Sequence, residues 1–197
     1  MKLLLLRCPH CAQALAPGQR DVVMMCPNCH SAVLIQEGGL ELVQGHFAAP
    51  KKSDYTHWVP VWIYQGQVKL LKRETQGRSW RPANQAKNFW AEPRRLYIPA
   101  WEIEIREAAD LTQELIGRQP FFREIPRPDD AVFEPVILTT EDIFKLLDLV
   151  VVTIEAERSD DMESLDFDLT VNSQELWFLP AVKHNEDWQL KAEEIKP

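Results

Sequence analysis

The sequence predicts an α+β protein in which a small, cysteine-bearing β module precedes a larger domain of mixed, mainly antiparallel α and β structure. Three observations lead to this prediction. All four cysteines lie within the first 29 residues, several later segments alternate apolar and polar residues, and one stretch near residue 150 has the apolar spacing of a helix. At 197 residues and 45% hydrophobic content, the chain is long enough for a small module and one ordinary domain.

The four cysteines form two Cys-Pro-x-Cys pairs, Cys8 with Cys11 and Cys26 with Cys29. A Cys-x-x-Cys turn directs both sulfur atoms toward one centre, so two such turns supply the four thiolates of a tetrahedral metal site. The competing interpretations are two disulfides, for which four cysteines allow three pairings, or four ordinary buried thiols. Nothing in the sequence marks the chain as secreted, so we favour metal binding.

The segments around the cysteine pairs have the pattern of a small β module. Short apolar runs lead into each pair, and two further runs flank the turn Glu37-Gly38-Gly39; these runs are residues 3–6, 22–25, 32–35 and 40–43. On these residues, segment 1–45 resembles a zinc ribbon, with a rubredoxin-like double Cys-Pro-x-Cys knuckle. The resemblance implies one structural Zn²⁺ ion held by Cys8, Cys11, Cys26 and Cys29. It covers less than a quarter of the chain, and the remainder resembles no family that we recognise.

Rubredoxins hold a single iron ion with the same four ligands, and glycine commonly follows each of their knuckles. Here Ala12 and His30 occupy those positions, so we favour zinc over iron. His10 and His30 are interpreted as exposed knuckle residues or as hydrogen-bond donors around the ligands. Four thiolates fill a tetrahedral site and leave no position for a substrate, which indicates a structural role for the metal.

The predicted domain organisation is a zinc ribbon at 1–45, a linker at 46–57 and an α+β interaction domain at 58–197. The apolar run at the N-terminus is too short for an export signal, which needs about seven apolar residues. No run of about 18 apolar residues is present, so no transmembrane helix is expected. A reducing, cytoplasmic location best fits four cysteines that bind a metal rather than form disulfides.

Charge is distributed unevenly along the chain. Residues 51–97 carry a net charge of +7 and residues 98–197 a net charge of −15, although the whole chain has only −8. Basic and aromatic residues alternate in segment 69–95, which we expect to be an irregular connection with a partner-binding surface. The candidate residues are Lys72, Arg73, Arg78, Trp80, Arg81, Trp90, Arg94 and Arg95. Three interpretations stay open for them: packing against the acidic half of the same chain, a protein partner, or a nucleic acid bound through phosphates and bases.

The larger domain is expected to contain several strands and two helices. We expect a hairpin in which strand 58–64 turns at Gln65-Gly66-Gln67 into a second arm at 68–71, and a further strand at 97–105. A short helix from Asp110 to Gly117 and a proline-rich loop at 118–130 follow. Thr139 or Thr140 then caps a helix at 141–158. The last third is expected to be a meander of strands near 167–171, 176–182 and 188–190, with turns at Asn172-Ser173 and at 184–187.

An aromatic-x-Pro pattern occurs four times in the larger domain, beginning at Trp58, Tyr97, Phe133 and Phe178. Proline lacks a ladder donor and favours strand starts, edges and bulges. The four copies therefore indicate strand starts, with a duplicated unit of about 40 residues as the less favoured explanation.

No phosphate-binding glycine loop, nucleophile elbow or zinc-protease motif is present. The sequence thus predicts a non-enzymatic adaptor or accessory subunit that mediates protein–protein interaction in a larger assembly. The alternatives are a nucleic-acid-binding accessory factor that uses segment 69–95, and a rubredoxin-like iron electron carrier.

Overall fold

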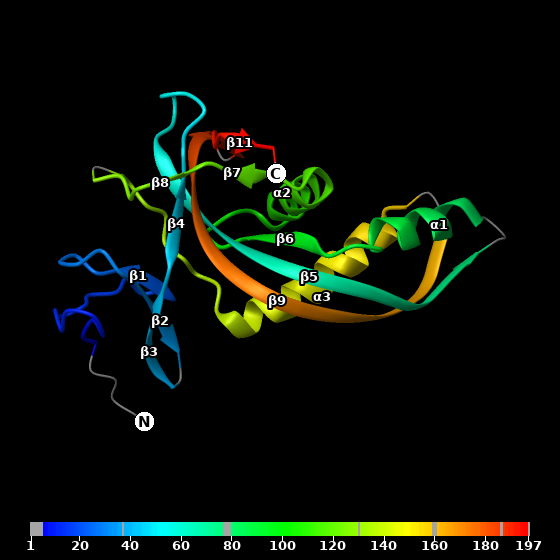
Figure 1. Cartoon of the computed structure of the whole chain (residues 1–197), viewed down its shortest axis with the longest axis horizontal. Coiled ribbons are helices and arrows are strands. Elements are labelled where there is room, and N and C mark those ends of the chain that lie inside the picture. Colours follow the sequence, from blue (N-terminus) through cyan, green and yellow to red (C-terminus); the bar gives the residue numbers. More distant parts are fainter. Residues whose placement is uncertain are drawn as a thin grey trace.

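A computed structural model describes residues 6–36, 38–76, 80–129, 131–158, 161–185 and 187–196 (Figure 1). This described part is mixed α+β, as predicted. Its helices are α1 (Trp80–Phe89), α2 (Ile105–Arg118) and α3 (Thr140–Ala156). Its strands are β1 (Val23–Met25), β2 (Ala32–Gln36), β3 (Gly39–Val43), β4 (Gly45–Ala48), β5 (His57–Gln76), β6 (Arg94–Pro99), β7 (Phe121–Phe122), β8 (Glu124–Ile125), β9 (Asp161–His184), β10 (Asp187–Leu190) and β11 (Glu194–Ile195).

The N-terminal module is a three-stranded antiparallel sheet in the order β1-β2-β3. The predicted hairpin of the apolar runs 32–35 and 40–43 is confirmed by the pairing of β2 with β3. Gly39 ends the connection with a φ of 141°, a backbone conformation that L side chains rarely adopt. Glu37, part of the expected turn, lies outside the described residues.

The larger sheet has the order β6-β5-β9-β4-β8, with β10 paired to β9. Its named pairs are antiparallel except for β4 with β9, which agrees with the predicted mainly antiparallel domain. β5 and β9 form a long curved ribbon, which α3 crosses on one side (Figure 1). α1 lies at one end of this ribbon and the N-terminal module lies near the other end. β7 and β11 form a separate two-stranded sheet.

Two expected turns are instead a single β-bulge. β5 continues through Gln65-Gly66-Gln67, and β9 continues through Asn172-Ser173, so the predicted hairpin arm at 68–71 is wrong. Gln65 pairs with Ser173 and Gly66 with Val171, which places the extra residue of β9 opposite this point. A Cβ on Gly66 would lie 2.9 Å from the Cδ1 atom of Leu96. The glycine therefore permits a close packing contact inside a strand. A glycine in the sequence fits this role as well as a turn, so composition alone does not distinguish the two.

Segment 69–95 is not the irregular connection that was expected. β5 extends to Gln76, residues 80–89 form α1, and β6 begins at Arg94. Pro82 lies close to the helix start, where a missing N–H donor costs nothing, and this position explains why the proline does not exclude a helix.

Four further boundaries differ from the prediction. Residues 45–48, around the start of the expected linker, form β4 in the larger sheet, and part of the expected loop 118–130 forms β7 and β8. The predicted strand 97–105 ends at Pro99. α2 begins at Ile105 rather than near Asp110, because the Glu104 carboxylate accepts hydrogen bonds from the backbone N–H groups of Arg106 and Glu107.

The predicted helix at 141–158 is confirmed as α3. Thr139 caps it, with its hydroxyl accepting from the Asp142 N–H at 3.1 Å while the Asp142 carboxylate accepts from the Thr139 N–H. The expected strand at 188–190 is confirmed as β10, which forms a hairpin with the end of β9.

The four aromatic-x-Pro copies converge in one core. Trp58 pairs with Pro180 and Pro60 with Phe178 across β5 and β9, and the copy at Tyr97 lies on β6 beside β5. Phe133 joins them through a parallel bridge to Trp58. Trp58 is at the start of β5, whereas Phe178 is deep within β9, so the strand-start interpretation does not apply to every copy. The Phe133 ring packs against the rings of both Trp58 and Phe178, so three of the four aromatic residues are in mutual contact in this core.

Candidate metal centre

Each cysteine pair forms a tight knuckle of the same backbone geometry. The N–H of Ala12 donates to the carbonyl of Cys8 at 2.9 Å, and the N–H of His30 donates to the carbonyl of Cys26 at the same distance. Ala12 and His30 have φ values of 60° and 59°, the left-handed conformation that glycine adopts most readily. The chain therefore forms the knuckles with two residues for which this conformation is strained.

The four sulfur atoms lie within 4.8 Å of one another. The Sγ atoms of Cys8 and Cys29 are 3.6 Å apart, and those of Cys11 and Cys26 are 3.5 Å apart. A disulfide requires about 2.05 Å, so the cysteines are free thiols in this arrangement. A tetrahedron with metal–sulfur bonds of about 2.3 Å has edges of about 3.8 Å, and the observed spacing fits such a site. The predicted cluster of four cysteine ligands is therefore present, and it is suited to holding a metal ion.

The surroundings of the cysteines shift the pKa values of their thiols in different directions. The Ser31 side chain, whose Oγ lies 3.4 Å from the Cys29 Sγ, together with the Ser31 backbone, lowers the pKa of Cys29 to about 5. Burial raises the pKa of Cys8 to about 11. Hydrogen bonds from the side chain of Asn28 and the backbone of Gln13 lower the pKa of Cys11. A cation bound among the sulfurs favours the thiolate forms and offsets the burial of Cys8.

β2 connects the metal centre to the rest of the protein. Met24 of β1 and Val33 of β2 pack with Cys8 and Cys26 in a small core around the thiols. The neighbouring residues Ala32 and Leu34 point to the opposite side and belong to the core of the larger domain. The Val22 N–H also donates to the Val136 carbonyl at 2.7 Å. The four-cysteine module is thus packed directly against the α+β domain.

Most of the candidate partner-binding residues that the structure describes are used inside the chain. Lys72 is 58% exposed and pairs with Glu74. The Arg94 guanidinium lies 3.6 Å from the centre of the Phe89 ring and donates to the Phe89 carbonyl. Arg78 lies outside the described residues, and so do the side chains of Trp80 and Arg81.

Arg73 and Trp90 meet at a buried carboxylate that the sequence analysis did not single out. Glu155 of α3 is fully buried and accepts from the Arg73 Nε and the Trp90 Nε1, each at 2.8 Å. Arg158 also donates to this carboxylate at 2.8 Å. The sequence contains a signal for the burial of Glu155, because this residue continues the four-residue spacing of the buried Ile143, Leu147 and Val151.

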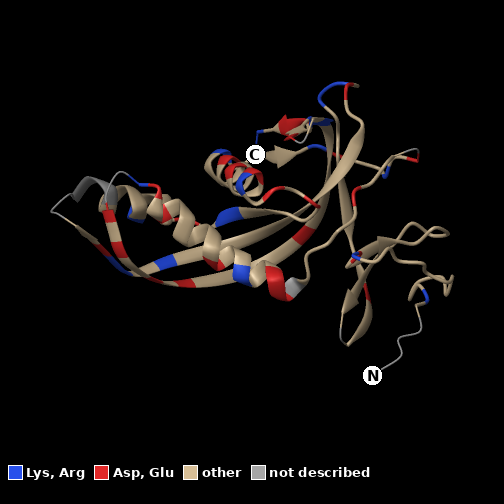
Figure 2. Cartoon of the chain, turned by 180° about the vertical axis from the view of Figure 1, so that it is seen from behind, with Lys and Arg blue, Asp and Glu red and all other residues tan. Residues whose placement is uncertain are grey.

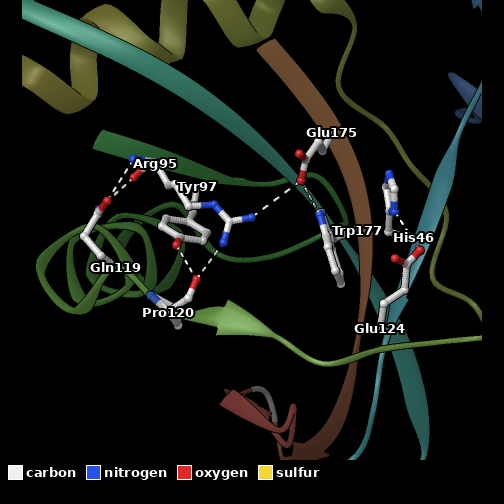
Figure 3. A network of polar contacts seen from close by, with 8 residues as sticks. All are labelled: His46, Arg95, Tyr97, Gln119, Pro120, Glu124, Glu175 and Trp177. Carbon is white, nitrogen blue, oxygen red and sulfur yellow. Dashed lines mark hydrogen bonds and ion pairs between the residues drawn. The ribbon is translucent and has the colours of Figure 1, made fainter. Parts of the chain in front are cut away.

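Arg95 belongs to a second internal network (Figure 3). Its guanidinium donates to the Pro120 carbonyl at 3.0 Å and forms an ion pair with Glu175 at 3.5 Å. The Glu175 carboxylate also accepts from the Trp177 indole at 2.7 Å, and the Trp177 ring stacks on His46. The network joins β6, β9 and β4 on one side of the sheet.

Part of the charge asymmetry is compensated within the chain. The basic strand β5 lies antiparallel to the acidic strand β9, with Lys69 opposite Asp168 and Lys72 opposite Asp166. Lys and Arg on β5 and Asp and Glu on β9 are visible along the ribbon in Figure 2. Together with the pairs Arg73–Glu155 and Arg95–Glu175, this register supports the interpretation that the basic segment packs against the acidic half.

Comparisons with protein-family models, with curated proteins and with solved structures each found no match. None of the helices in the described part of the chain combines the length and the apolar character that a membrane span requires.

Proposed function

We propose that this chain is a non-enzymatic adaptor in which a structural zinc ion stabilises a ribbon module that mediates protein–protein interaction in a larger, cytoplasmic assembly. The observation that carries the proposal is the closed cluster of four sulfur atoms. Four thiolates complete a tetrahedral coordination shell, so a bound ion cross-links the two knuckles and has no position for a substrate.

The position of the cluster supports an interaction role. The knuckle residues Pro9, His10, Pro27 and Asn28 are exposed, while the other face of the ribbon packs into the larger domain. The ion would therefore hold an exposed surface in a fixed orientation. Among the described residues, no second group of His, Cys, Asp or Glu has the spacing of a metal site.

Nothing in the part of the chain that the structure describes favours the nucleic-acid alternative. Segment 69–95 supplied the candidate residues for it, and Arg73, Trp90 and Arg95 direct their polar atoms to Glu155, Pro120 and Glu175 of the same chain.

The test is native mass spectrometry of the protein isolated gently from its own cells, with metal analysis of the same sample. We expect one zinc ion per chain and a protein partner in fixed stoichiometry, both lost in the Cys26→Ser variant. A Ser31→Ala variant changes a residue beside the ligands and should keep the metal and the partner. One iron ion per chain would replace the proposal with electron transfer, and bound nucleic acid without a protein partner would replace it with the accessory-factor alternative.

A further inference from the structure

The ribbon has a long strand edge that nothing covers within the described residues. β9 pairs with β5 from Asp161 to Ala181, but on its other side β4 pairs only with Leu176–Phe178 and β10 only with Ala181–His184. From Asp161 to Glu175 the second side of β9 has no paired strand in the described part of the chain. Figure 1 shows this stretch of β9 as a border of the molecule. Such an edge presents unpaired N–H and C=O groups to an additional strand.

A groove runs beside this free edge. α3 and β9 border an open groove of about 590 Å³, lined by Phe144, Lys145 and Asp148 of the helix and by Leu169, Val171 and residues 172–174 of the strand. Phe144 is 48% exposed, and Leu169 and Val171 are half-buried. Leu169 and Val171 alternate along β9 and therefore point to the same side of the sheet.

A free strand edge beside a helix is suited to binding an extended peptide. The added chain forms backbone hydrogen bonds with the edge, and every second side chain enters the groove between strand and helix. Here the edge of β9 would supply the backbone groups, and Phe144, Leu169 and Val171 would contact apolar side chains. The edge and the groove are separate observations that indicate the same kind of ligand.

The charge of the β9 edge indicates which kind of chain could bind there. Five acidic residues and no Lys or Arg lie between positions 161 and 175; the acidic ones are Asp161, Glu163, Asp166, Asp168 and Glu175. Asp166 and Asp168 are exposed and lie opposite Lys72 and Lys69 of β5, but no ion pair joins them among the described residues, and Lys72 pairs with Glu74 instead. A second copy of β9 would bring the same acidic residues against these, so pairing between two copies is disfavoured. Lys or Arg on the added chain would instead be attracted to these carboxylates.

We infer that the edge of β9 and the Phe144 groove bind an extended segment of a partner protein, with apolar side chains at alternate positions and Lys or Arg between them. This inference rests on the proposed adaptor function and names the chemistry of its partner. The metal centre takes no part in it, since the groove is lined only by α3 and β9.

The probe is a ten-residue peptide of alternating valine and lysine, labelled for fluorescence anisotropy and measured with the full chain at physiological ionic strength. Its control has the same sequence with N-methylated valines, which keeps the charge and removes backbone donors. We expect binding of the unmodified peptide and a loss of at least about ten-fold in affinity for the methylated one. Equal affinity for the two peptides would overturn the proposal, because it would show attraction by charge alone.

Two variants of α3 separate the groove from the other apolar surface of this helix. Phe144→Ala is expected to lower the affinity for the unmodified peptide about ten-fold. Leu149→Ala is the matched control, because Leu149 is similarly exposed, at 57%, but lines the cavity of about 260 Å³ between α2 and α3. If the Leu149 variant lost binding and the Phe144 variant did not, the peptide would bind in that cavity, and the proposed site at the β9 edge would be wrong.

A second pair of measurements keeps the test independent of any folding defect in the Phe144 variant. Asp166→Asn with Asp168→Asn removes two exposed charges without placing new lysines opposite Lys72 and Lys69 of β5, and we expect it to weaken binding of the valine–lysine peptide several-fold. Hydrogen exchange should show protection of amides 165–175 on peptide binding, and protection elsewhere would contradict the inference. If native mass spectrometry finds a partner but the peptide does not bind, only the inference fails; if no partner exists, the adaptor proposal fails whatever the peptide does.

Discussion

At the scale of single residues, the most consequential side chain is the buried carboxylate of Glu155. It is fully buried and is the common acceptor for Arg73 of β5, Trp90 after α1 and Arg158 after α3. Isolating a charge from water is costly unless partners and hydrogen bonds compensate it. The three donors supply this compensation, so the carboxylate joins the far end of the β5–β9 ribbon to the helices.

We expect Glu155→Gln to destabilise the protein by about 3–5 kcal/mol, because two buried guanidinium groups lose their counter-charge. The measurement is urea unfolding monitored by tryptophan fluorescence. Glu141→Gln is the control on the same helix. It removes an exposed pair with Lys145, and the loss of such a solvent-screened pair should have little effect on stability. Similar losses in the two variants would show that the buried cluster has no special role in stability.

At the scale of elements, sequence signals predict helices best where a cap and an apolar stripe coincide. α3 has both, since Thr139 and Asp142 form a capping box before the stripe of Ile143, Leu147 and Val151. α2 was misplaced because its cap is a glutamate, Glu104, which is not among the residues that usually cap helices.

Removing the α3 cap should have a modest and pH-dependent effect. Thr139→Ala is expected to cost about 1 kcal/mol, and Thr139→Ser to cost little, because serine keeps the hydroxyl acceptor. The Thr139 side chain lowers the pKa of Asp142 below its ordinary value of 3.8. A lowered folded-state pKa means that this stabilisation is present above about pH 4 and is lost as the pH falls through the folded pKa.

The check is urea unfolding of the Ala and Ser variants at pH 7 and at pH 3. We expect the difference between the Ala variant and the wild type to shrink at pH 3. A difference of the same size at both pH values would show that the Asp142 carboxylate does not contribute to the capping box.

At the scale of the whole molecule, the four-cysteine module is packed into the α+β domain. Val23, Ala32 and Leu34 lie in the larger core, one residue away in sequence from Met24 and Val33 of the core around the thiols. A change at the metal centre must therefore reach the larger domain through β1 and β2.

We expect Cys26→Ser to lose the metal, to open residues 6–43 to proteolysis and to lower the free energy of unfolding of the larger domain by a few kcal/mol. In small metal modules binding and folding are one equilibrium, and fully burying one valine or leucine side chain is worth about 1.5–3 kcal/mol. Limited proteolysis followed by mass spectrometry locates the cleavage, and thermal unfolding measures the loss. Retention of metal and of protease resistance in this variant would contradict the four-cysteine site.

The sequence by itself determined the four-cysteine cluster, the β2–β3 hairpin and helix α3. In each case the controlling interactions are local: a fixed spacing of two cysteines, a glycine turn, and a cap followed by an apolar stripe. Only the tertiary structure decided what Gly66 and Asn172 do, because a bulge and a turn require similar residues and differ in whether a distant strand is paired there. It also decided that Arg73, Trp90 and Arg95 point into the chain and that one edge of β9 is left free. Ion pairs such as Arg73–Glu155 join residues more than 80 positions apart, and no local pattern specifies which charges meet.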